Sequence, residues 1–140
     1  MGYECAMHFQ RAEPPLKIAD SRAAQRFFAG CFAECDDRKE HLFVAHLDEQ
    51  GRCLHLSSHE GDACSASFPI RDIVATAATL SSAGLVLAHN HPSGNARPSR
   101  ADCRSTRRLA AVAEAIDCSL LDHLVFGGGA CTSLRQIGLL

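Results

Sequence analysis

The chain divides into segments in which apolar residues recur every three or four positions and segments in which they form short continuous runs. The first pattern is typical of a helix with one buried face, and the second is typical of a buried strand. Helices are predicted at residues 20–35, 69–81 and 99–116. Strands are predicted at residues 42–48, 53–57, 85–88 and 120–126. The order helix, hairpin, helix, strand, helix, strand predicts an α/β domain with a mixed sheet and helices packed on it.

Residues at the ends of these segments support the boundaries. Asp20 suits the N-cap of the first helix, and Pro69 suits the first turn of the second. Gly51 suits a hairpin turn between the first two strands, and Gly84 suits the stop after the second helix. The residues predicted to face the core from the three helices are Ala24, Phe27, Phe28, Cys31 and Phe32; Ile70, Ile73, Val74, Ala77 and Leu80; and Thr106, Leu109, Ala113 and Ile116.

Length and composition are those of one globular domain: 140 residues, 46% of them hydrophobic and 21% charged. Residues 1–19 contain two consecutive prolines and weak periodicity, so we predict an arm or leader there, ending in a short edge strand at residues 16–18. The domain is then expected to span residues 20–140. The net charge of −2 gives no overall nucleic-acid footprint.

The eight cysteines are irregularly spaced and form no C-x-x-C pair, which argues against a zinc ribbon. The N-terminus lacks the basic and apolar regions of a signal peptide, and no apolar run approaches membrane-spanning length. These features predict a cytoplasmic protein with reduced thiols that does not enter a membrane.

One stretch combines several residues that are typical of a metal site. It reads His-x-His, seven residues, Ser, two residues, Asp, from His89 to Asp102. Because side chains alternate along a strand, His89 and His91 are expected to point to the same side. Ser99 and Asp102 have the spacing of a capping box, which places Asp102 in the first turn of a helix. Three such ligands leave a fourth position open, as in a catalytic zinc site.

Each of these residues also has a purely structural interpretation. A histidine near a strand end is commonly a surface or core residue, and Ser99 and Asp102 can serve only as helix caps. The capping roles are compatible with the chemical ones. The combination of both histidines with a capped acidic residue is much rarer than any one of them, and it favours the metal site.

The pattern resembles the signature of the JAMM (MPN-plus) zinc metallopeptidases, and the wording HNHPSG followed by PS-x-x-D resembles their bacterial RadC branch. Segments 120–125 and 133–140, and the short Pro-x-Arg start at residue 69, are similar to that branch as well. The resemblance covers about residues 20–140. It implies a JAB/MPN-like fold, a curved mixed sheet flanked by helices in a cytidine-deaminase-like sandwich.

The resemblance also implies an activity and roles for residues. It implies that His89, His91 and Asp102 bind Zn²⁺, that the fourth ligand is a water molecule and that Ser99 stabilises the developing oxyanion. Glu40 lies eight residues before Asp48, as a glutamate does in the RadC branch, and the implied role is general base. Weaker rivals for that role are Glu34, Glu49 and Glu60. The implied reaction is hydrolysis of a peptide or of an isopeptide bond in a protein substrate.

Some features leave alternatives open. Five arginines between Arg97 and Arg108 can form a solvated helix face or hold an anionic partner, and the first reading is favoured. Asp122 and His123 can support a ligand histidine or be structural.

The alternative function is a RadC-like DNA-associated or protein-binding module with a non-catalytic zinc site. Residues 1–19 leave no room for the helix-hairpin-helix-like region expected before RadC domains, which weakens a nucleic-acid partner. A zinc deaminase is disfavoured because His89 does not begin an H-x-E motif. The sequence does not specify an oligomeric state.

Overall fold

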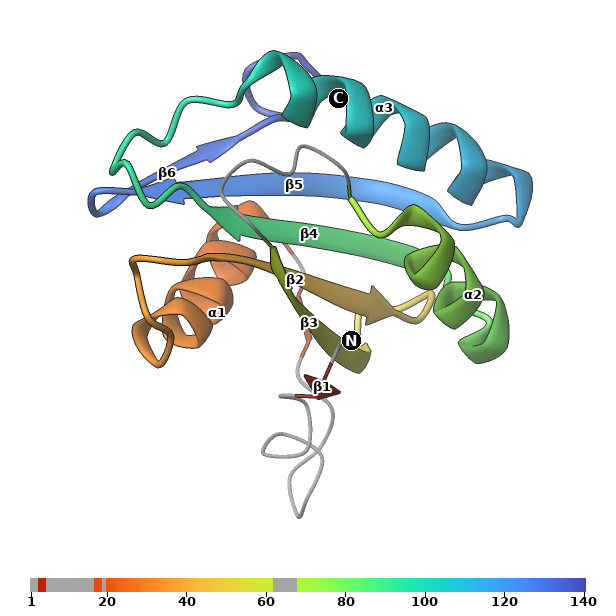
Figure 1. The fold of residues 1–140 in the computed structure, drawn as a ribbon. Coiled ribbons are helices and arrows are strands. Elements are labelled where there is room, and N and C mark those ends of the chain that lie inside the picture. Colours follow the sequence, from red (N-terminus) through yellow and green to blue (C-terminus); the bar gives the residue numbers. More distant parts are fainter. Residues whose placement is uncertain (1–2, 5–16, 19, 62–67) are drawn as a thin grey trace.

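The structure is a computed structural model that describes residues 3–4, 17–18, 20–61 and 68–140. Its centre is a six-stranded mixed sheet with the strand order β1-β3-β2-β4-β5-β6 (Figure 1). Strands β4 and β5 are parallel, and the other neighbours are antiparallel. The strands are β1 (Tyr3–Glu4), β2 (Glu40–Leu47), β3 (Cys53–Gly61), β4 (Gly84–Asn90), β5 (Ser119–Gly127) and β6 (Ala130–Ser133). The helices are α1 (Ser21–Ala33), α2 (Ile70–Leu80) and α3 (Arg100–Ala115).

The helices cover both faces of the sheet. Helix α1 lies on one face, while α2 and α3 lie on the other (Figure 1). One hydrophobic cluster packs α1 against the sheet, with Phe28 and Phe43 among its buried residues. A second cluster packs α2 and α3 against the opposite face, with Ile73 and Leu109 among its residues. This three-layer arrangement confirms the predicted α/β class with a mixed sheet flanked by helices.

Strand β4 is the central element, because every one of its residues is buried. It pairs with β2 on one side and β5 on the other. The parallel β4–β5 pair is connected through α3, which therefore lies over the same part of the sheet. As a result, the C-terminal end of β4 and the N-terminal turn of α3 meet at one edge of the domain.

The predicted helix starts are confirmed at two places. The Asp20 carboxylate accepts a hydrogen bond from the Ala23 N–H at 2.8 Å and caps α1. Ser99 and Asp102 form a reciprocal capping box at the start of α3. The predicted hairpin is also present, since His46 pairs with His55 across β2 and β3.

Several boundary predictions were wrong. Gly84 is the first residue of β4 and does not stop α2. That helix ends at Leu80, and its C-cap Ser81 adopts a left-handed conformation with φ of 52°. Ile116 was expected in the core, but it follows the last residue of α3 and is 37% exposed. Strand β3 continues to Gly61, four residues beyond the predicted end at residue 57. Strand β6 was not predicted, because a run of four residues carries little periodicity.

Most of the predicted arm at residues 1–19 lies outside the described residues. Of the edge strand expected at residues 16–18, Lys17 forms an isolated bridge with Arg52, and Ile18 belongs to the core beneath α1. Within the described part of the chain, no helix has the length and apolar character needed to cross a lipid bilayer.

Candidate metal centre

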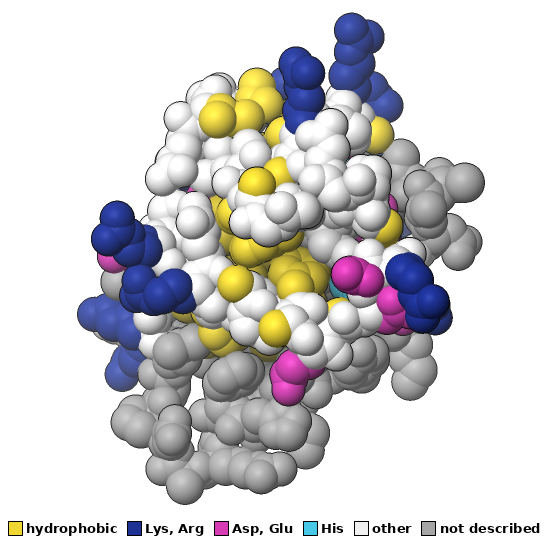
Figure 2. All heavy atoms as spheres, turned by 90° about the vertical axis from the view of Figure 1, so that its left-hand side faces the viewer, with side chains coloured by type: hydrophobic (Ala, Val, Ile, Leu, Met, Phe, Trp, Pro, Cys, Tyr) yellow, Lys and Arg dark blue, Asp and Glu magenta, His cyan; other side chains and the backbone are white. Residues whose placement is uncertain are grey.

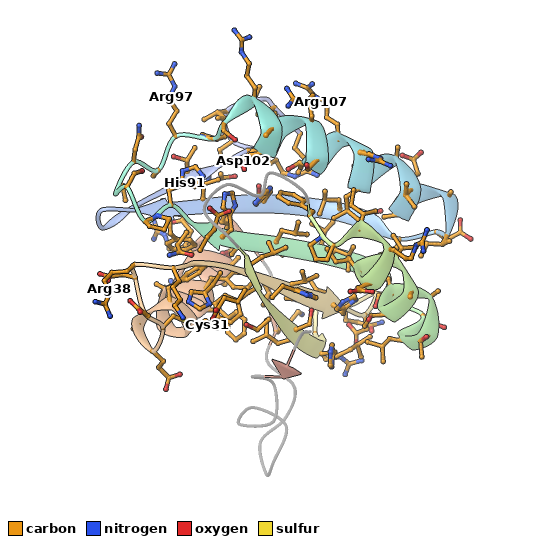
Figure 3. All side chains as sticks on the ribbon, in the orientation of Figure 1. Cys31, Arg38, His91, Arg97, Asp102 and Arg107 are labelled. Carbon is orange, nitrogen blue, oxygen red and sulfur yellow. The ribbon has the colours of Figure 1, made fainter. Side chains whose placement is uncertain are left out.

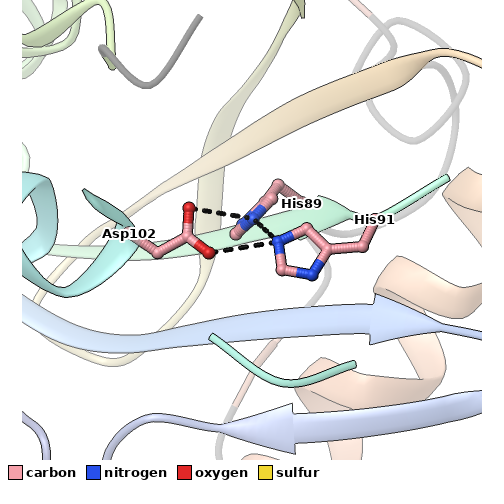
Figure 4. Close-up of side chains that lie close together, drawn as sticks. All are labelled: His89, His91 and Asp102. Carbon is pink, nitrogen blue, oxygen red and sulfur yellow. Dashed lines mark hydrogen bonds and ion pairs between the residues drawn. The ribbon is translucent and has the colours of Figure 1, made fainter. Parts of the chain in front are cut away.

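Three potential ligands converge at the edge where β4 meets α3. His89 is the second-last residue of β4, His91 follows the strand, and Asp102 is in the first turn of α3. One ligand atom from each lies within 4.8 Å of the others. The two Nε2 atoms are 2.9 Å apart, and Asp102 carboxylate oxygens lie 3.4 Å from that of His89 and 3.1 Å from that of His91 (Figure 4). The structure therefore brings together the three ligands predicted from the spacing.

The capping box fixes the carboxylate of Asp102. The Ser99 N–H donates to Asp102 Oδ2 at 2.8 Å, and the Asp102 N–H donates to Ser99 Oγ at 3.0 Å. Burial opposes ionisation of Asp102, but a protonated His89, through its hydrogen bond and its charge, and the hydrogen bonds of Ser99 outweigh burial and hold the pKa of the carboxyl well below its usual range. Asp102 is therefore an anion at neutral pH and presents a charged oxygen to the histidines.

A buried hydrogen-bond chain determines which nitrogen of His89 carries a proton. The Thr106 hydroxyl donates its single hydrogen to the Asp102 carbonyl oxygen at 2.6 Å, since a carbonyl can only accept. In the contact of 2.7 Å between Thr106 and His123, the donor must then be His123 Nδ1–H. The other nitrogen of His123 is bare and accepts from His89 Nδ1–H, also at 2.7 Å. His89 Nε2 is left with its lone pair directed at the centre.

His91 also has its lone pair on Nε2, and a different hydrogen bond fixes this tautomer. His91 Nδ1 lies 2.8 Å from the Asn95 carbonyl oxygen, so this nitrogen is the donor and Nε2 carries the lone pair. The His91 backbone N–H donates to the Phe126 carbonyl oxygen at 2.8 Å, which ties the start of the loop to β5. The loop then rests on two glycines. A Cβ on Gly127 would lie 2.8 Å from the Ala96 nitrogen, and one on Gly128 would lie 2.6 Å from the Gly94 oxygen.

These donor atoms fit a divalent cation. Two bare imidazole nitrogens at 2.9 Å and an ionised carboxylate bring three lone pairs to one point, an arrangement that a shared cation or proton must stabilise. Two imidazoles with one carboxylate are ligands that zinc accepts, and three protein ligands leave a position open. The edge of Phe68 packs on the rings of His89 and His123, with ring centroids 6.3 Å and 5.2 Å apart, and contributes an apolar neighbour.

Glu40 is brought to the same edge by strand pairing. Leu42 pairs with His89 across the antiparallel β2–β4 ladder, so Glu40, two residues earlier, projects from the same face as His89. Burial raises the pKa of its half-buried carboxyl, while the charges of the nearby His89 and His91 act in the opposite direction.

Asn90 holds the start of β2 in place. Its side-chain oxygen accepts from the His41 N–H at 2.7 Å, and its side-chain amide donates to the Lys39 carbonyl oxygen at 2.9 Å. The two bonds flank Glu40 on either side. Asn90 lies between His89 and His91, so the same short segment supplies the candidate ligands and anchors the candidate base.

The rival glutamates have other positions. Glu34 is the exposed C-cap of α1, and Glu49 lies in the turn at the far end of the β2–β3 hairpin. Glu60 is opposite His41 on β3 and forms an ion pair of 3.6 Å with Lys39. The Glu40 carboxyl interacts electrostatically with His89, His91 and Asp102.

Asp122 and His123 have different roles, and only His123 contacts a candidate ligand. His123 contacts His89 directly and is fully buried. Asp122 accepts from the His123 and Arg135 backbone N–H groups and from the Ser133 hydroxyl, so it joins β5 to the segment after β6. From the sequence, Thr106 was predicted only to face the core, and no role was predicted for Asn90. Their partners are distant in sequence, and no local pattern signals them.

The arginines of α3 lie on the outer face of that helix. Arg97 and Arg107 point away from the body of the molecule, on the side opposite His91 and Asp102 (Figure 3). Arg100, Arg104 and Arg107 line a depression of about 340 Å³ together with Ser99. None of the five arginines forms an ion pair with an acidic residue in the described part of the chain.

The fold and this His-x-His and Asp site are those of a JAB-type domain. Residues 18–139 match the family model of the RadC-like JAB domain, and the chain belongs to that family. It is similar to a UPF0758 protein of Pelodictyon phaeoclathratiforme, with 36% identity over 125 residues, which cover 89% of this chain and 55% of the relative. It is 41% identical over 104 residues to a UPF0758 protein of Vibrio vulnificus, covering 74% of this chain and 46% of the relative. The chain therefore spans about half the length of the curated relatives it matches.

Proposed function

We propose that the protein is a zinc-dependent hydrolase that cleaves a peptide or isopeptide bond in a protein substrate. The observation that carries the proposal is the convergence of three metal-competent atoms whose lone pairs are oriented by independent hydrogen bonds. Membership of the RadC-like JAB family supports a hydrolase of this type. In this proposal His89, His91 and Asp102 hold the metal.

The chemistry that Zn²⁺ supplies when bound is Lewis acidity, which activates water and polarises a carbonyl oxygen. Glu40 takes up the proton of the attacking water on its carboxylate and passes it to the departing amine. Its raised pKa suits that exchange, because a base poised closer to neutrality returns the proton more readily. Ser99 Oγ accepts from the Asp102 N–H, so its own hydrogen is available to the carbonyl oxygen as negative charge develops.

Elemental analysis of the protein purified without added metal tests the metal site. About one zinc per chain is expected in the wild type, and loss of that zinc in Asp102→Asn, which keeps a side-chain oxygen for the capping box but removes the charge. Asp20→Asn is the matched control, because Asp20 caps α1 and has no place in the centre. A wild type that holds no zinc and takes none up on titration contradicts the proposal.

Hydrolysis is tested separately. Zinc-loaded protein is incubated with an unfolded protein and with a lysine-linked isopeptide, and products are identified by mass spectrometry. Glu40→Gln is expected to retain zinc and to lose at least 100-fold in rate, in line with removal of a general base. Equal rates for Glu40→Gln and wild type would exclude Glu40 as the base.

A second candidate function rests on the arginine-lined depression of α3. Its three guanidinium groups without acidic partners in the described residues favour an anionic ligand. A DNA-associated module would bind a fluorescent single-stranded oligonucleotide with an affinity that falls steeply with salt and with Arg104→Glu. An affinity unchanged by that substitution would remove this candidate.

A further inference from the structure

A groove opens beside the metal centre on the opposite face of the sheet, between α1 and the turn that joins β5 to β6. It has a volume of about 690 Å³. Arg26, Ala29 and Phe32 form the α1 side, and residues 127–131 form the other side. Figure 2 shows it as a hollow with a hydrophobic floor and with charged side chains around its margin. The groove is of a size that binds ligands in other proteins.

The floor of the groove is apolar and is incompletely covered. Phe32 and Phe126 lie with ring centroids 5.0 Å apart, and both remain partly exposed although they pack against the core. Ala29 is exposed and lines the same groove. Partly exposed aromatic rings in a concave site favour a ligand that buries an apolar side chain there.

The margin of the groove carries Arg26, Arg38 and the acidic Asp37, and one of its two guanidinium groups has no counter-ion among the described residues. Arg38 is engaged by Asp36 at 3.1 Å, but Arg26 forms no ion pair with an acidic residue in the described part of the chain. A guanidinium at the margin of an apolar groove is complementary to a carboxylate on the ligand. The ligand should therefore combine an apolar side chain with an acidic one.

The groove reaches the candidate reaction centre. Asn90, His91 and Pro92 form its end, so one of the three metal-competent residues also lines it. Along the opposite side, Gly127, Gly128 and Gly129 have no side chains, so the main chain of a ligand can approach their peptide groups closely. A polypeptide in an extended conformation satisfies all of these features, because it offers a main chain together with alternating side chains.

We propose that the groove between α1 and residues 127–131 binds an extended segment of the protein substrate on one side of the bond to be cleaved. The segment carries an apolar side chain over Phe32 and Phe126 and an acidic side chain beside Arg26. This inference rests on the proposed hydrolase function, because the bound segment is a substrate only if the protein cleaves it. Binding of a peptide in the groove does not itself require the metal.

The test measures peptide binding in a form of the protein that cannot turn the peptide over. The probe is a fluorescein-labelled octapeptide with one leucine and one glutamate among glycine and serine residues, titrated with the full chain carrying Asp102→Asn. A counterpart with lysine in place of glutamate reports on the charge. The glutamate peptide is expected to bind at least tenfold more tightly than the lysine peptide.

Two further substitutions locate the binding in the groove. Ala29→Trp fills it from an exposed helix position and is expected to weaken binding of the glutamate peptide at least tenfold. Arg26→Glu is expected to reverse the preference between the two peptides. The matched controls are Ala111→Trp on α3 and Arg22→Glu one turn earlier on α1, both exposed and outside the groove, and neither should change the affinity. Thermal unfolding confirms that each variant is folded.

The outcomes separate this inference from the proposed function. If the protein holds no zinc but the peptide results are as expected, the groove is a peptide-binding site and the hydrolase proposal fails. If zinc binding and hydrolysis hold but the two peptides bind equally, or neither binds, or Ala29→Trp and Arg26→Glu have no effect, the groove proposal is overturned.

Discussion

At the scale of single residues, one hydroxyl hydrogen determines the protonation pattern of the centre. Thr106 donates to the Asp102 carbonyl oxygen, which makes its oxygen an acceptor for His123 and leaves His89 Nε2 bare. Thr106→Val keeps the shape of the side chain but removes the acceptor, so His123 and His89 are no longer held in these tautomers. Outer contacts of this kind are worth about 10–100-fold in metal affinity.

We therefore expect Thr106→Val to weaken zinc binding by about tenfold or more. Thr106→Ser retains the hydroxyl and is expected to bind zinc nearly as the wild type does. Competition with a chromophoric zinc chelator at pH 7 measures both constants. If the valine and serine variants bind zinc equally well, the hydrogen-bond chain does not orient His89.

His46 makes stability depend on pH. It is fully buried, with one ring nitrogen 3.0 Å from the Ser82 hydroxyl and the other without a hydrogen-bond partner among the described residues. Burial, together with the charges of His55 and His59, lowers its pKa to about 4. Between about pH 6.5 and pH 4 the unfolded chain therefore binds a proton at His46 that the folded chain does not, and stability falls as the pH falls.

This difference should cost about 2 kcal/mol of unfolding free energy between pH 7 and pH 5. Urea denaturation of the metal-free protein at the two pH values measures it. His46→Gln should reduce the loss by about that amount, and the remaining loss reflects other groups such as His123, whose pKa burial also lowers. The same loss in the variant and the wild type would show that His46 does not titrate in this window.

The convergence of His89, His91 and Asp102 was predictable from the sequence because they lie within one short segment and because a strand and a capping box have fixed geometry. Their supporting residues were not. The Asn90 oxygen bonds the His41 nitrogen across 49 residues of chain, and such a contact exists only once β2 and β4 are paired. Glu40 was assigned through the family resemblance alone, since an isolated glutamate at a strand start has no chemical signature.

At the scale of elements, the centre depends on how closely the loop after β4 can approach the end of β5. Gly127 and Gly128 allow this approach, as a Cβ on either residue would meet backbone atoms at 2.8 Å or less. Their packing role was hidden because it concerns residues 94–96, which come about thirty positions earlier.

Gly128→Ala and Gly129→Ala form a matched pair that tests this packing. Both residues have positive φ, 55° and 82°, so both substitutions cost about 1–2 kcal/mol of backbone strain. A Cβ at position 128 also meets the Gly94 oxygen at 2.6 Å, whereas at position 129 it meets nothing within 4 Å. We expect Gly128→Ala to be the more destabilising in urea denaturation and to weaken zinc binding, while Gly129→Ala leaves zinc affinity unchanged. Equal zinc affinities would show that the loop tolerates displacement.

The errors at element boundaries have a common physical origin. Sequence patterns register which residues are apolar, whereas boundaries depend on backbone contacts. Helix α2 ends at Leu80 because Ser81 turns into a left-handed conformation and the Ser82 N–H donates to the Ala77 carbonyl oxygen, and Gly84 can then begin β4. Ile116 is exposed because the helix ends one residue before it and the chain turns away at Asp117, which has φ of 60°.

At the scale of the whole molecule, the centre joins elements that are otherwise held by separate contacts. His89 and His91 belong to the central strand and its continuation, while Asp102 belongs to a helix on one face of the sheet. A metal bound by all three is bound by the folded chain far better than by the unfolded one. Such binding stabilises the fold by about 2.7 kcal/mol when the free metal is at one hundred times its Kd.

Removal of the metal should therefore lower the thermal stability of the entire domain. For a domain of this size, about 2.7 kcal/mol corresponds to roughly 5–10 °C in Tm. We expect EDTA to lower the Tm by that amount and added zinc to restore it, and we expect Asp102→Asn to have the lower Tm with either addition. Asp20→Asn retains a side-chain oxygen for its cap and should keep the full response to zinc, because its contact lies on α1. A wild-type Tm that is the same in EDTA and in zinc would mean that these three side chains converge for structural reasons and hold no metal.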